Sequence, residues 1–423
     1  MDNCGALRDG QRVAVIGAGP GGVGAALALS KGARERGVKL KIFLFECKRF
    51  GEHQNQCLGV LSPPFLSILR RGFGIELPHS IIQRSIKGYV LATASDEVAL
   101  DCESEAEYSH SVRRVQLDSF LLSRAQESGV EVAQSRVTDM EVSQEGVIVY
   151  SDSGNCEADA VIGAFGLDDA MADVFERRTS YRPPAALRTV VTKIHPREQR
   201  IADALLSDRI YTYLPRIRNI EFGALVPKGD HVSVVVAGKE VTARDMDLFL
   251  QLPEVSRVLP SDVSHGSYYK GSFPLGAAAN IYGDRYAVVG DAAGLVRPFK
   301  GKGINSALLT GRFVANTMLE KGVSERALKH FYDACSDFTA DVWYGRLMRF
   351  LATATANYFS VDRVIALAKR DPAVKRALFD CVSGHRPFRE IVRRNLNLPF
   401  VARVLKTIAV EGSLDRIARR RAH

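Results

Sequence analysis

The hydrophobic pattern of the N-terminal residues predicts a strand, a helix and a second strand. Arg12–Ile16 (RVAVI) is a short apolar run of the length and composition of a buried parallel strand. Pro20–Arg36 then has a helical pattern with small residues on its packed face, and Lys39–Phe45 (KLKIFLF) is a second apolar run. A helix between two such strands forms a right-handed crossover, so this order predicts a parallel sheet covered by helices.

The pattern changes in the middle of the chain. Residues 68–112 and 178–280 are rich in β-branched and alternating segments, which predicts a mostly antiparallel sheet inserted into the first domain. Between these two stretches, Leu117–Ser128 has a helical pattern, and Val147–Gly166 is expected to return to the first sheet.

The last third of the chain is predicted to be mainly helical. Tyr286–Gly290 (YAVVG) is expected to form one more buried strand, and a helix should begin near Gly303. From about Ser324 the pattern stays helical, with breaks expected at Pro372, Pro387 and Pro399.

Composition places the chain among globular proteins of a reducing compartment. No run of about 18 uncharged apolar residues is present, and Met1–Arg12 lacks the apolar segment of a signal peptide. The seven cysteines are scattered and contain no CxxC pair, which argues against a disulfide framework and against a zinc or iron–sulfur site. We therefore expect a cytoplasmic protein without a metal site.

A glycine-rich turn follows the first strand. Gly17, Gly19 and Gly22 fit the GxGxxG spacing, which allows a tight turn, close backbone approach to a pyrophosphate and close helix–strand contact. Pro20 opens the helix whose N-terminal N–H groups would face the phosphates. Glu46 ends the next strand, where a carboxylate accepts a hydrogen bond from a ribose hydroxyl. The pattern predicts a nucleotide site built from these five residues.

A second motif extends the site. Tyr286–Gly294 (YAVVGDAAG) is followed by Pro298 and by the GKGI sequence Gly301–Ile304. These residues resemble the GDA(A/S)G…P…GxGI block of the flavoproteins related to p-hydroxybenzoate hydroxylase. The resemblance implies FAD as the cofactor, with Asp291 on the ribityl chain and the following helix end facing the flavin. The implied FAD contacts in this block are Gly290, Asp291, Gly301, Lys302, Gly303 and Ile304.

Two further segments fit the same group, and a third departs from it. Arg113–Leu121 resembles an R-x-x-(F/L)-D-x-x-L segment whose arginine, here Arg114, lies against the cofactor. Val137 falls where the group pairs its backbone with the adenine edge. Asp159–Gly166 resembles DxVIGADG, but Phe165 replaces the second aspartate, which helps to link FAD and NAD(P)H binding. The replacement argues against direct use of a nicotinamide.

Within this superfamily the chain is most similar to the geranylgeranyl reductases. Asn55–Leu61 (NQCLGVL) resembles their C-G-x-G-like segment near the isoalloxazine, and Phe222–Val232 (FGALVPKGDHV) resembles their (Y/F)-G-W-x-(F/V)-P-K-G-D-H-x-x-V stretch. With Gly271–Leu275, the resemblance covers about residues 10–315. It implies hydride transfer from reduced flavin to C=C bonds of an isoprenoid or lipid-like substrate.

Cys57 is the candidate catalytic residue. The corresponding cysteine of the reductases lies near the flavin, so the resemblance implies that Cys57 contacts the cofactor and donates a proton to the substrate or tunes the flavin. A small, buried apolar residue is the competing interpretation. His53 and His195 are further candidates for proton donation or substrate contact, against an ordinary loop position for each.

The net charge of +9 is concentrated in residues 346–423, which hold 17 Lys and Arg against 6 Asp and Glu. Basic helices there could dock on an anionic membrane surface, receive an acidic electron donor such as ferredoxin, or form an ordinary solvated face. The electron donor is accordingly expected to be NAD(P)H or reduced ferredoxin. No nucleic-acid-binding module is recognisable, so nucleic acid is not an expected partner.

Together the motifs predict an α/β fold with three parts. These are a Rossmann-like FAD-binding domain of the p-hydroxybenzoate hydroxylase type (10–67, 113–177 and 281–322), an inserted, mostly antiparallel β-sheet substrate domain (68–112 and 178–280) and a basic helical C-terminal region (323–423). The predicted function is an FAD-dependent reductase. The alternatives are a flavin-dependent monooxygenase and a non-catalytic electron-relay flavoprotein. The halogenase signature W-x-W-x-I-P is absent, because Trp343 is the only tryptophan.

Overall fold

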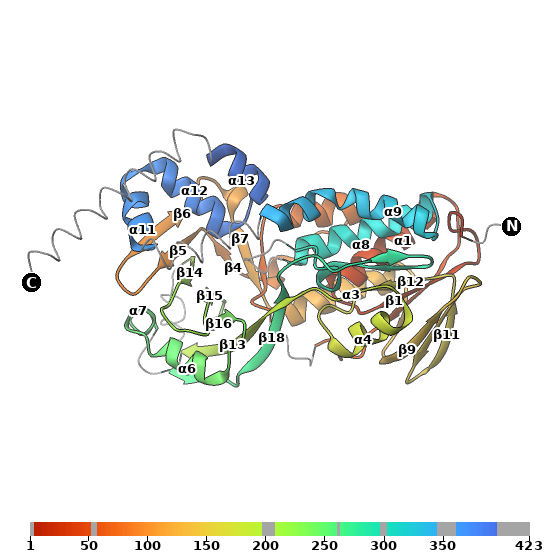
Figure 1. The fold of residues 1–423 in the computed structure, drawn as a ribbon, viewed down its shortest axis with the longest axis horizontal. Helices are drawn as coiled ribbons and strands as arrows, with labels where there is room; N and C mark the ends of the chain where they lie inside the picture. The colour runs from red at the N-terminus through yellow and green to blue at the C-terminus, as the bar shows by residue number, and fades with distance from the viewer. Residues whose placement is uncertain are drawn as a thin grey trace, which may run out of the picture. The chain divides into compact units, whose positions relative to one another are not determined.

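The computed structural model describes residues 4–51, 57–196, 208–259, 263–296, 303–344 and 361–395 (Figure 1). By its internal contacts the chain divides into two compact units. Unit 1 comprises Met1–Ile82, Val112–Leu187 and Ser272–Val342, and unit 2 comprises Gln83–Ser111, Arg188–Gly271 and Trp343–His423. The C-terminal residues therefore group with the antiparallel sheet, whereas the predicted boundaries set them apart. None of the helices in the described ranges is long and apolar enough to cross a membrane.

Unit 1 is built on a six-stranded sheet with the order β19-β20-β12-β1-β2-β8. The strands are β1 (Arg12–Ile16), β2 (Lys41–Phe45), β8 (Glu131–Ala133), β12 (Ala160–Gly163), β19 (Tyr282–Gly283) and β20 (Tyr286–Val288). All neighbours in this sheet are parallel except β19 and β20. The strand–helix–strand unit predicted from the first 45 residues is confirmed.

The helices of unit 1 are α1 (Pro20–Glu35), α3 (Arg114–Glu127), α8 (Gly303–Glu320) and α9 (Glu325–Ala334). α1 packs against α3 and α8, and α8 also contacts α9 (Figure 1). Glycines let α1 and α8 approach closely. A Cβ atom on Gly24 would lie 2.9 Å from the Leu308 carbonyl oxygen, and one on Gly311 would lie 2.3 Å from the Gly21 carbonyl oxygen. This contact fixes the N-terminal end of α8 beside the glycine-rich turn.

The return to the first sheet is shorter than the sequence pattern suggested. Only β12 joins it, whereas β9 (Val137–Val142), β10 (Val147–Ser151) and β11 (Gly154–Ala158) form a separate three-stranded antiparallel sheet. The prediction for Val147–Gly166 was therefore wrong in its first part. β11 is exposed along most of its length, which is typical of a half-buried antiparallel hairpin and not of a buried parallel strand.

The remaining elements of unit 1 are short. They are β3 (Val60–Leu61), α2 (Phe65–Ser67), the π-helix η1 (Ile68–Phe73), η2 (His79–Ile81), α4 (Asp169–Arg178) and η4 (Gly290–Ala293). Two expectations need correction: the first residues of the 68–112 stretch are helical, and α3 begins at Arg114, three residues before the expected start.

Unit 2 is built on an eight-stranded sheet with the order β17-β13-β16-β15-β14-β5-β6, and β18 pairs with β13. The strands are β5 (Gly88–Ala92), β6 (Glu97–Asp101), β13 (Ala186–Pro196), β14 (Arg209–Tyr213), β15 (Phe222–Pro227), β16 (Val232–Gly238), β17 (Val263–His265) and β18 (Tyr269–Pro274). Except for the parallel pair of β5 and β14, the pairings along this path are antiparallel, as predicted.

Unit 2 also contains helices, several of which contact strands of this sheet. They are α6 (Ala243–Leu250), α7 (Pro253–Ser256), α11 (Val361–Arg370), α12 (Pro372–Ser383) and α13 (Phe388–Asn395), and the other short elements are β4 (Ile82–Ile86), η3 (Glu105–Glu107) and β7 (Ser109–Val112). The break expected at Pro372 is the start of α12, where the Asp371 side chain accepts hydrogen bonds from the N–H groups of Ala373 and Val374.

Candidate functional site

The turn after β1 requires glycine at two of its positions. Gly17 has a φ of +101°, and a Cβ atom there would lie 2.5 Å from the Ala164 carbonyl oxygen. A Cβ atom on Gly22 would lie 1.8 Å from the Gly17 carbonyl oxygen. The close contact of helix, turn and neighbouring strand predicted for this motif is therefore present.

The N-terminus of α1 is open to a ligand. Gly19 is the N-cap, no side chain accepts a hydrogen bond from the first turn, and that turn carries no acidic residue. No protein atom lies within 4 Å of the position of a Cβ on Gly19. Uncapped N–H groups and the positive end of a helix bind phosphate, so this end of α1, with Pro20 in its first turn, fits the pyrophosphate of FAD.

Glu46 directly follows β2 and lies against the same turn. One carboxylate oxygen accepts a hydrogen bond from the Ala18 N–H at 2.9 Å, and the other accepts one from the Lys48 N–H at 2.8 Å. The backbone N–H of Glu46 donates to the Ala133 carbonyl at the end of β8. These bonds hold the carboxylate at the edge of the turn. Each oxygen keeps a lone pair that can accept a hydrogen bond from a ribose hydroxyl.

Val137 lies a few residues beyond Ala133. It is buried at the first position of β9. The resemblance implies that the backbone of Val137 contacts the adenine. Val137 follows β8, whose last residue, Ala133, accepts a hydrogen bond from Glu46.

The second half of the expected site lies where β20 leads into η4 and α8. Gly290 has a φ of +66°, and its N–H donates to the Thr310 hydroxyl at 3.1 Å. Burial raises the pKa of Asp291, and the positive charge of Arg114 opposes that shift. A Cβ atom on Gly303, the first residue of α8, would lie 2.5 Å from the Asp291 carboxylate, so a larger residue is excluded there. Ile304 is buried in the same turn of α8.

Arg114 connects the predicted residues with one that the sequence left without a role. Its Nε and Nη2 atoms donate to Oδ1 of Asp118 at 3.2 and 2.8 Å, and the guanidinium also interacts with the Cys57 thiol. Burial by itself disfavours the charged form, but Asp118 and Cys57 outweigh it and raise the pKa of Arg114. The four-residue spacing on one helix is the sequence signal that would have identified Asp118 as the partner.

Cys57 is exposed, and its sulfur accepts a hydrogen bond from the Gly59 N–H at 3.4 Å. The competing interpretation, a small buried residue, does not describe it. Asp291 and Cys57 both interact electrostatically with Arg114, so these residues surround one guanidinium. A carboxylate, a thiol and a permanent positive charge therefore lie near one another, close to the N-terminal end of α8.

Phe165, which stands where the family carries an aspartate, belongs to an aromatic cluster. Its ring centroid lies 4.8 Å from that of Phe175 and 6.0 Å from that of Tyr181. The Tyr181 hydroxyl donates to the carbonyl of Ala292, next to Asp291, at 2.7 Å. The Phe165 ring therefore packs against Tyr181, which is hydrogen-bonded to the segment that contains Asp291.

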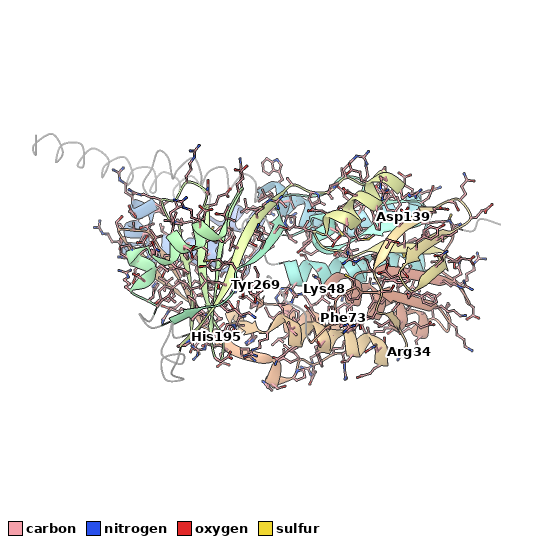
Figure 2. The ribbon with its side chains drawn as sticks, turned by 90° about the horizontal axis from the view of Figure 1, so that it is seen from below. Arg34, Lys48, Phe73, Asp139, His195 and Tyr269 are labelled. Atoms are coloured by element: carbon pink, nitrogen blue, oxygen red, sulfur yellow. The ribbon has the colours of Figure 1, made fainter. Side chains whose placement is uncertain are left out.

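Several predicted residues lie outside the described ranges. They are His53, Asn55, Gln56, Pro298, Gly301, Lys302 and Pro399. His195 is described, and it is exposed at the end of β13 in unit 2 (Figure 2). Its ring stacks on that of His231.

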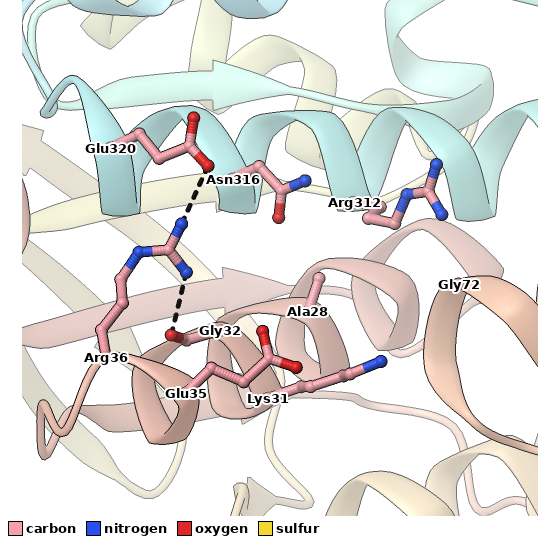
Figure 3. Close-up of a pocket in the computed structure, with 9 residues that line it drawn as sticks. All are labelled: Ala28, Lys31, Gly32, Glu35, Arg36, Gly72, Arg312, Asn316 and Glu320. Atoms are coloured by element: carbon pink, nitrogen blue, oxygen red, sulfur yellow. Dashed lines mark hydrogen bonds and ion pairs between the residues drawn. The ribbon is translucent and has the colours of Figure 1, made fainter.

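One cavity lies at the C-terminal half of α1, away from the glycine-rich turn. Figure 3 shows its lining residues, Ala28, Lys31, Gly32, Glu35, Arg36, Gly72, Arg312, Asn316 and Glu320. Arg36 donates there to Glu320 at 2.8 Å and to the Gly32 carbonyl at 3.0 Å. The lining is mostly polar, and none of the predicted cofactor residues belongs to it.

No family model matches the chain. Among curated proteins it is similar to the chloroplastic geranylgeranyl diphosphate reductase of Nicotiana tabacum, with 26% identity over 333 residues that cover 73% of this chain and 66% of the tobacco protein. It is 27% identical over 341 residues to the digeranylgeranylglycerophospholipid reductase of Methanococcus vannielii, covering 77% of this chain and 82% of that protein. The matched region is thus about two-thirds of the length of the plant relative.

Solved structures show the same fold. A geranylgeranyl bacteriochlorophyll reductase-like protein from Thermoplasma acidophilum matches with a TM-score of 0.67 and 17% identity, covering 92% of this chain and 99% of that one. The chain is thus similar in sequence to geranylgeranyl reductases, and it shares the fold of a geranylgeranyl reductase-like protein. A triple mutant of a flavin-dependent brominase also matches, with a TM-score of 0.63 and 16% identity over 90% of this chain and 98% of that one. The predicted resemblance to geranylgeranyl reductases is borne out by these relatives, and the predicted fold class and enzyme class, the FAD-dependent oxidoreductases, are confirmed.

Proposed function

We propose that this chain is a reductase that adds hydrogen across C=C bonds of an isoprenoid or similar lipid, with FAD as its cofactor. One observation carries the proposal. The uncapped N-terminus of α1 and the fixed Glu46 carboxylate form one half of an FAD site, and Asp291 at the start of α8 forms the other. The names of the relatives, which are reductases of geranylgeranyl groups, support the substrate class.

Saturation of a C=C bond needs a hydride on one carbon and a proton on the other. Reduced FAD, when bound, supplies the hydride and both electrons. We assign the proton to the thiol of Cys57, which is exposed and interacts with Arg114. The guanidinium of Arg114 would compensate the negative charge that remains on the sulfur after proton transfer, and solvent returns the proton afterwards.

The electron donor is proposed to be reduced ferredoxin or a similar acidic protein, with NAD(P)H as the alternative. The packing of Phe165 among Phe175 and Tyr181 supports this choice, because an apolar ring occupies the position of the family's aspartate. A basic surface near the C-terminus would attract such a donor. Part of the basic excess is already paired within unit 2, since Lys369 pairs with Asp96 and Arg376 pairs with Glu107. The docking surface must therefore draw on other basic residues.

Anaerobic photometry of the purified full-length chain tests the proposal. Bound FAD should be bleached by the donor and should recover its oxidised spectrum when geranylgeranyl diphosphate is added as the probe substrate. Mass spectrometry should then show a product with two more hydrogen atoms for each bond reduced. Substrate-dependent oxygen consumption with no reduced product would instead establish a monooxygenase, the activity class nearest to that of the brominase that shares the fold. A chain that takes up no FAD would overturn the entire proposal.

A further inference from the structure

Two histidines of unit 2 face each other across neighbouring strands. β13 and β16 are antiparallel, and the last pair of their ladder joins Ile194 to Val232. One step further, this register places His195 opposite His231, on the same face of the sheet. The two rings are stacked, with centroids 5.0 Å apart and an angle of 28° between their planes. His195 is exposed, and His231 is buried.

A carboxylate joins the pair from a tight turn. β15 and β16 are connected by a short hairpin in which the Lys228 N–H donates to the His231 carbonyl at 2.8 Å, leaving Gly229 and Asp230 at the tip. Oδ1 of Asp230 lies 2.7 Å from Nδ1 of His231. Because the turn is only two residues long, the carboxylate and the imidazole stay adjacent, and a small side-chain rotation separates their two atoms from hydrogen-bond distance to the spacing of ligands on one ion.

One nitrogen from each histidine and one carboxylate oxygen of Asp230 lie within 4.8 Å of one another. Ligands of a zinc ion at about 2.0–2.2 Å are closer together than that limit, so the site closes by a rotation of a side chain. His195 is exposed at the strand end and has room for it. Asp230 and His231 therefore lie side by side on the hairpin, and His195 can complete a set of three ligands by a rotation of its side chain.

We propose that His195, Asp230 and His231 form a binding site for a divalent transition-metal ion, of which Zn²⁺ is the representative. Two imidazoles and one carboxylate suit such an ion, whereas Mg²⁺ and Ca²⁺ prefer sites made of oxygen atoms. Three protein ligands leave a fourth position for water or for an anionic oxygen atom. The buried Lys228 interacts electrostatically with His231. The negative charge of Asp230 offsets the positive charge of Lys228 near the site.

The sequence expectation of no metal site rested on the cysteines, and this site does not use them. A metal ion here would join β13 to the β15–β16 hairpin, two segments that are separated in sequence and paired through the β13–β16 ladder. It would therefore stabilise unit 2, because an ion that binds only the folded state raises the unfolding temperature.

The test uses the untagged full-length chain, freed of metal with EDTA and dialysed against Zn²⁺. We expect one Zn²⁺ per chain that is lost in His195→Ala and in Asp230→Asn, with the affinity reduced at least about tenfold. His330→Ala is the matched control, because His330 is an exposed histidine on α9 in unit 1. Zn²⁺ should raise the unfolding temperature of the wild-type chain and of the control, but not that of His195→Ala.

Substitution with Co²⁺ identifies the ligands. A spectrum without a thiolate-to-cobalt charge-transfer band agrees with nitrogen and oxygen ligands, whereas such a band would assign the ion to cysteines and overturn the proposal. Wild-type protein that binds no Zn²⁺ at micromolar concentrations, or His195→Ala protein that binds it like the wild type, would overturn it as well. Far-UV circular dichroism of each variant separates loss of the site from loss of the fold.

Discussion

Arg114 donates two hydrogen bonds to a single oxygen of Asp118, one helical turn further along α3. The Asp118 side chain is 3% exposed and the Arg114 side chain 11% exposed. Removal of one partner from a buried pair typically costs about 3–5 kcal/mol, because the other charge stays buried without compensation. Cys57 and Asp291 still interact with Arg114 in Asp118→Ala, so we expect this variant to lose less, about 1.5–3 kcal/mol of unfolding free energy in urea titrations.

The control for this pair is Lys329 with Asp333, which has the same spacing on α9 but is exposed. Exposed pairs of this kind contribute about 0.3–0.5 kcal/mol. Asp333→Ala should therefore change stability by less than 1 kcal/mol. Equal losses in the two variants would show that burial does not decide the contribution of Arg114.

Cys57→Ser should slow C=C reduction and leave FAD content unchanged. The thiol is proposed to give a proton to the substrate, and general acids contribute about 10²–10⁴-fold to such steps. The measurement is the single-turnover rate at which pre-reduced enzyme is reoxidised by substrate without oxygen. Cys156→Ser, on β11, is the matched control. A Cys57→Ser rate equal to that of the control would remove Cys57 from the chemistry.

Two glycines of the first turn should respond differently to a methyl group. Gly19→Ala places its Cβ in open space in the protein, so stability should change little while FAD affinity falls at least about tenfold as the methyl meets the phosphates. Gly22→Ala places its Cβ 1.8 Å from the Gly17 carbonyl oxygen and should reduce stability as well. Thermal unfolding without FAD, together with fluorescence titration of FAD, separates the two effects. Gly19→Ala protein with normal FAD affinity would contradict the assigned phosphate position.

Phe165→Asp restores the family's residue but should not create NADPH-dependent reduction. The carboxylate would replace a ring that packs on Phe175 and Tyr181, and we expect a loss of about 2–4 kcal/mol of stability. The milder Phe165→Leu should lose about 1 kcal/mol. Stopped-flow bleaching with NADPH is the readout, and a faster rate in Phe165→Asp would show that this one position selects the donor.

Glu107 should make part of the stability of unit 2 depend on pH. Hydrogen bonds from Arg376 lower the pKa of Glu107 below its ordinary value of 4.5, against the effect of burial. A lowered pKa in the folded state means that the contribution is complete above the ordinary value and is lost as the pH falls through the folded-state value. Glu107→Gln should therefore cost about 1–2 kcal/mol at pH 7, and the difference from wild type should shrink below pH 4.5. Glu105→Gln, at an exposed position of the same 3₁₀ turn, should show no such trend.

The sequence alone determined the local structure of the first half of the candidate nucleotide site. β1, the glycine-rich turn, α1, β2 and Glu46 follow one another within 35 residues, Arg12–Glu46, and their geometry depends on local periodicity and on the freedom of glycine. The second motif was assigned through its resemblance to a flavoprotein block, which could be recognised because Gly290, Asp291 and Gly303 lie close together in the chain. Short-range patterns carry this information since neighbouring residues share one strand or one helix turn.

Only the tertiary structure decided which distant residues meet. The contact between Arg114 and Cys57, the packing of Phe165 on Tyr181 and the separate sheet formed by β9, β10 and β11 depend on long-range packing and register. The same holds for His195 and His231, which are far apart in sequence and become neighbours through the pairing of β13 with β16. A shift of that register by one residue would move one histidine to the other face.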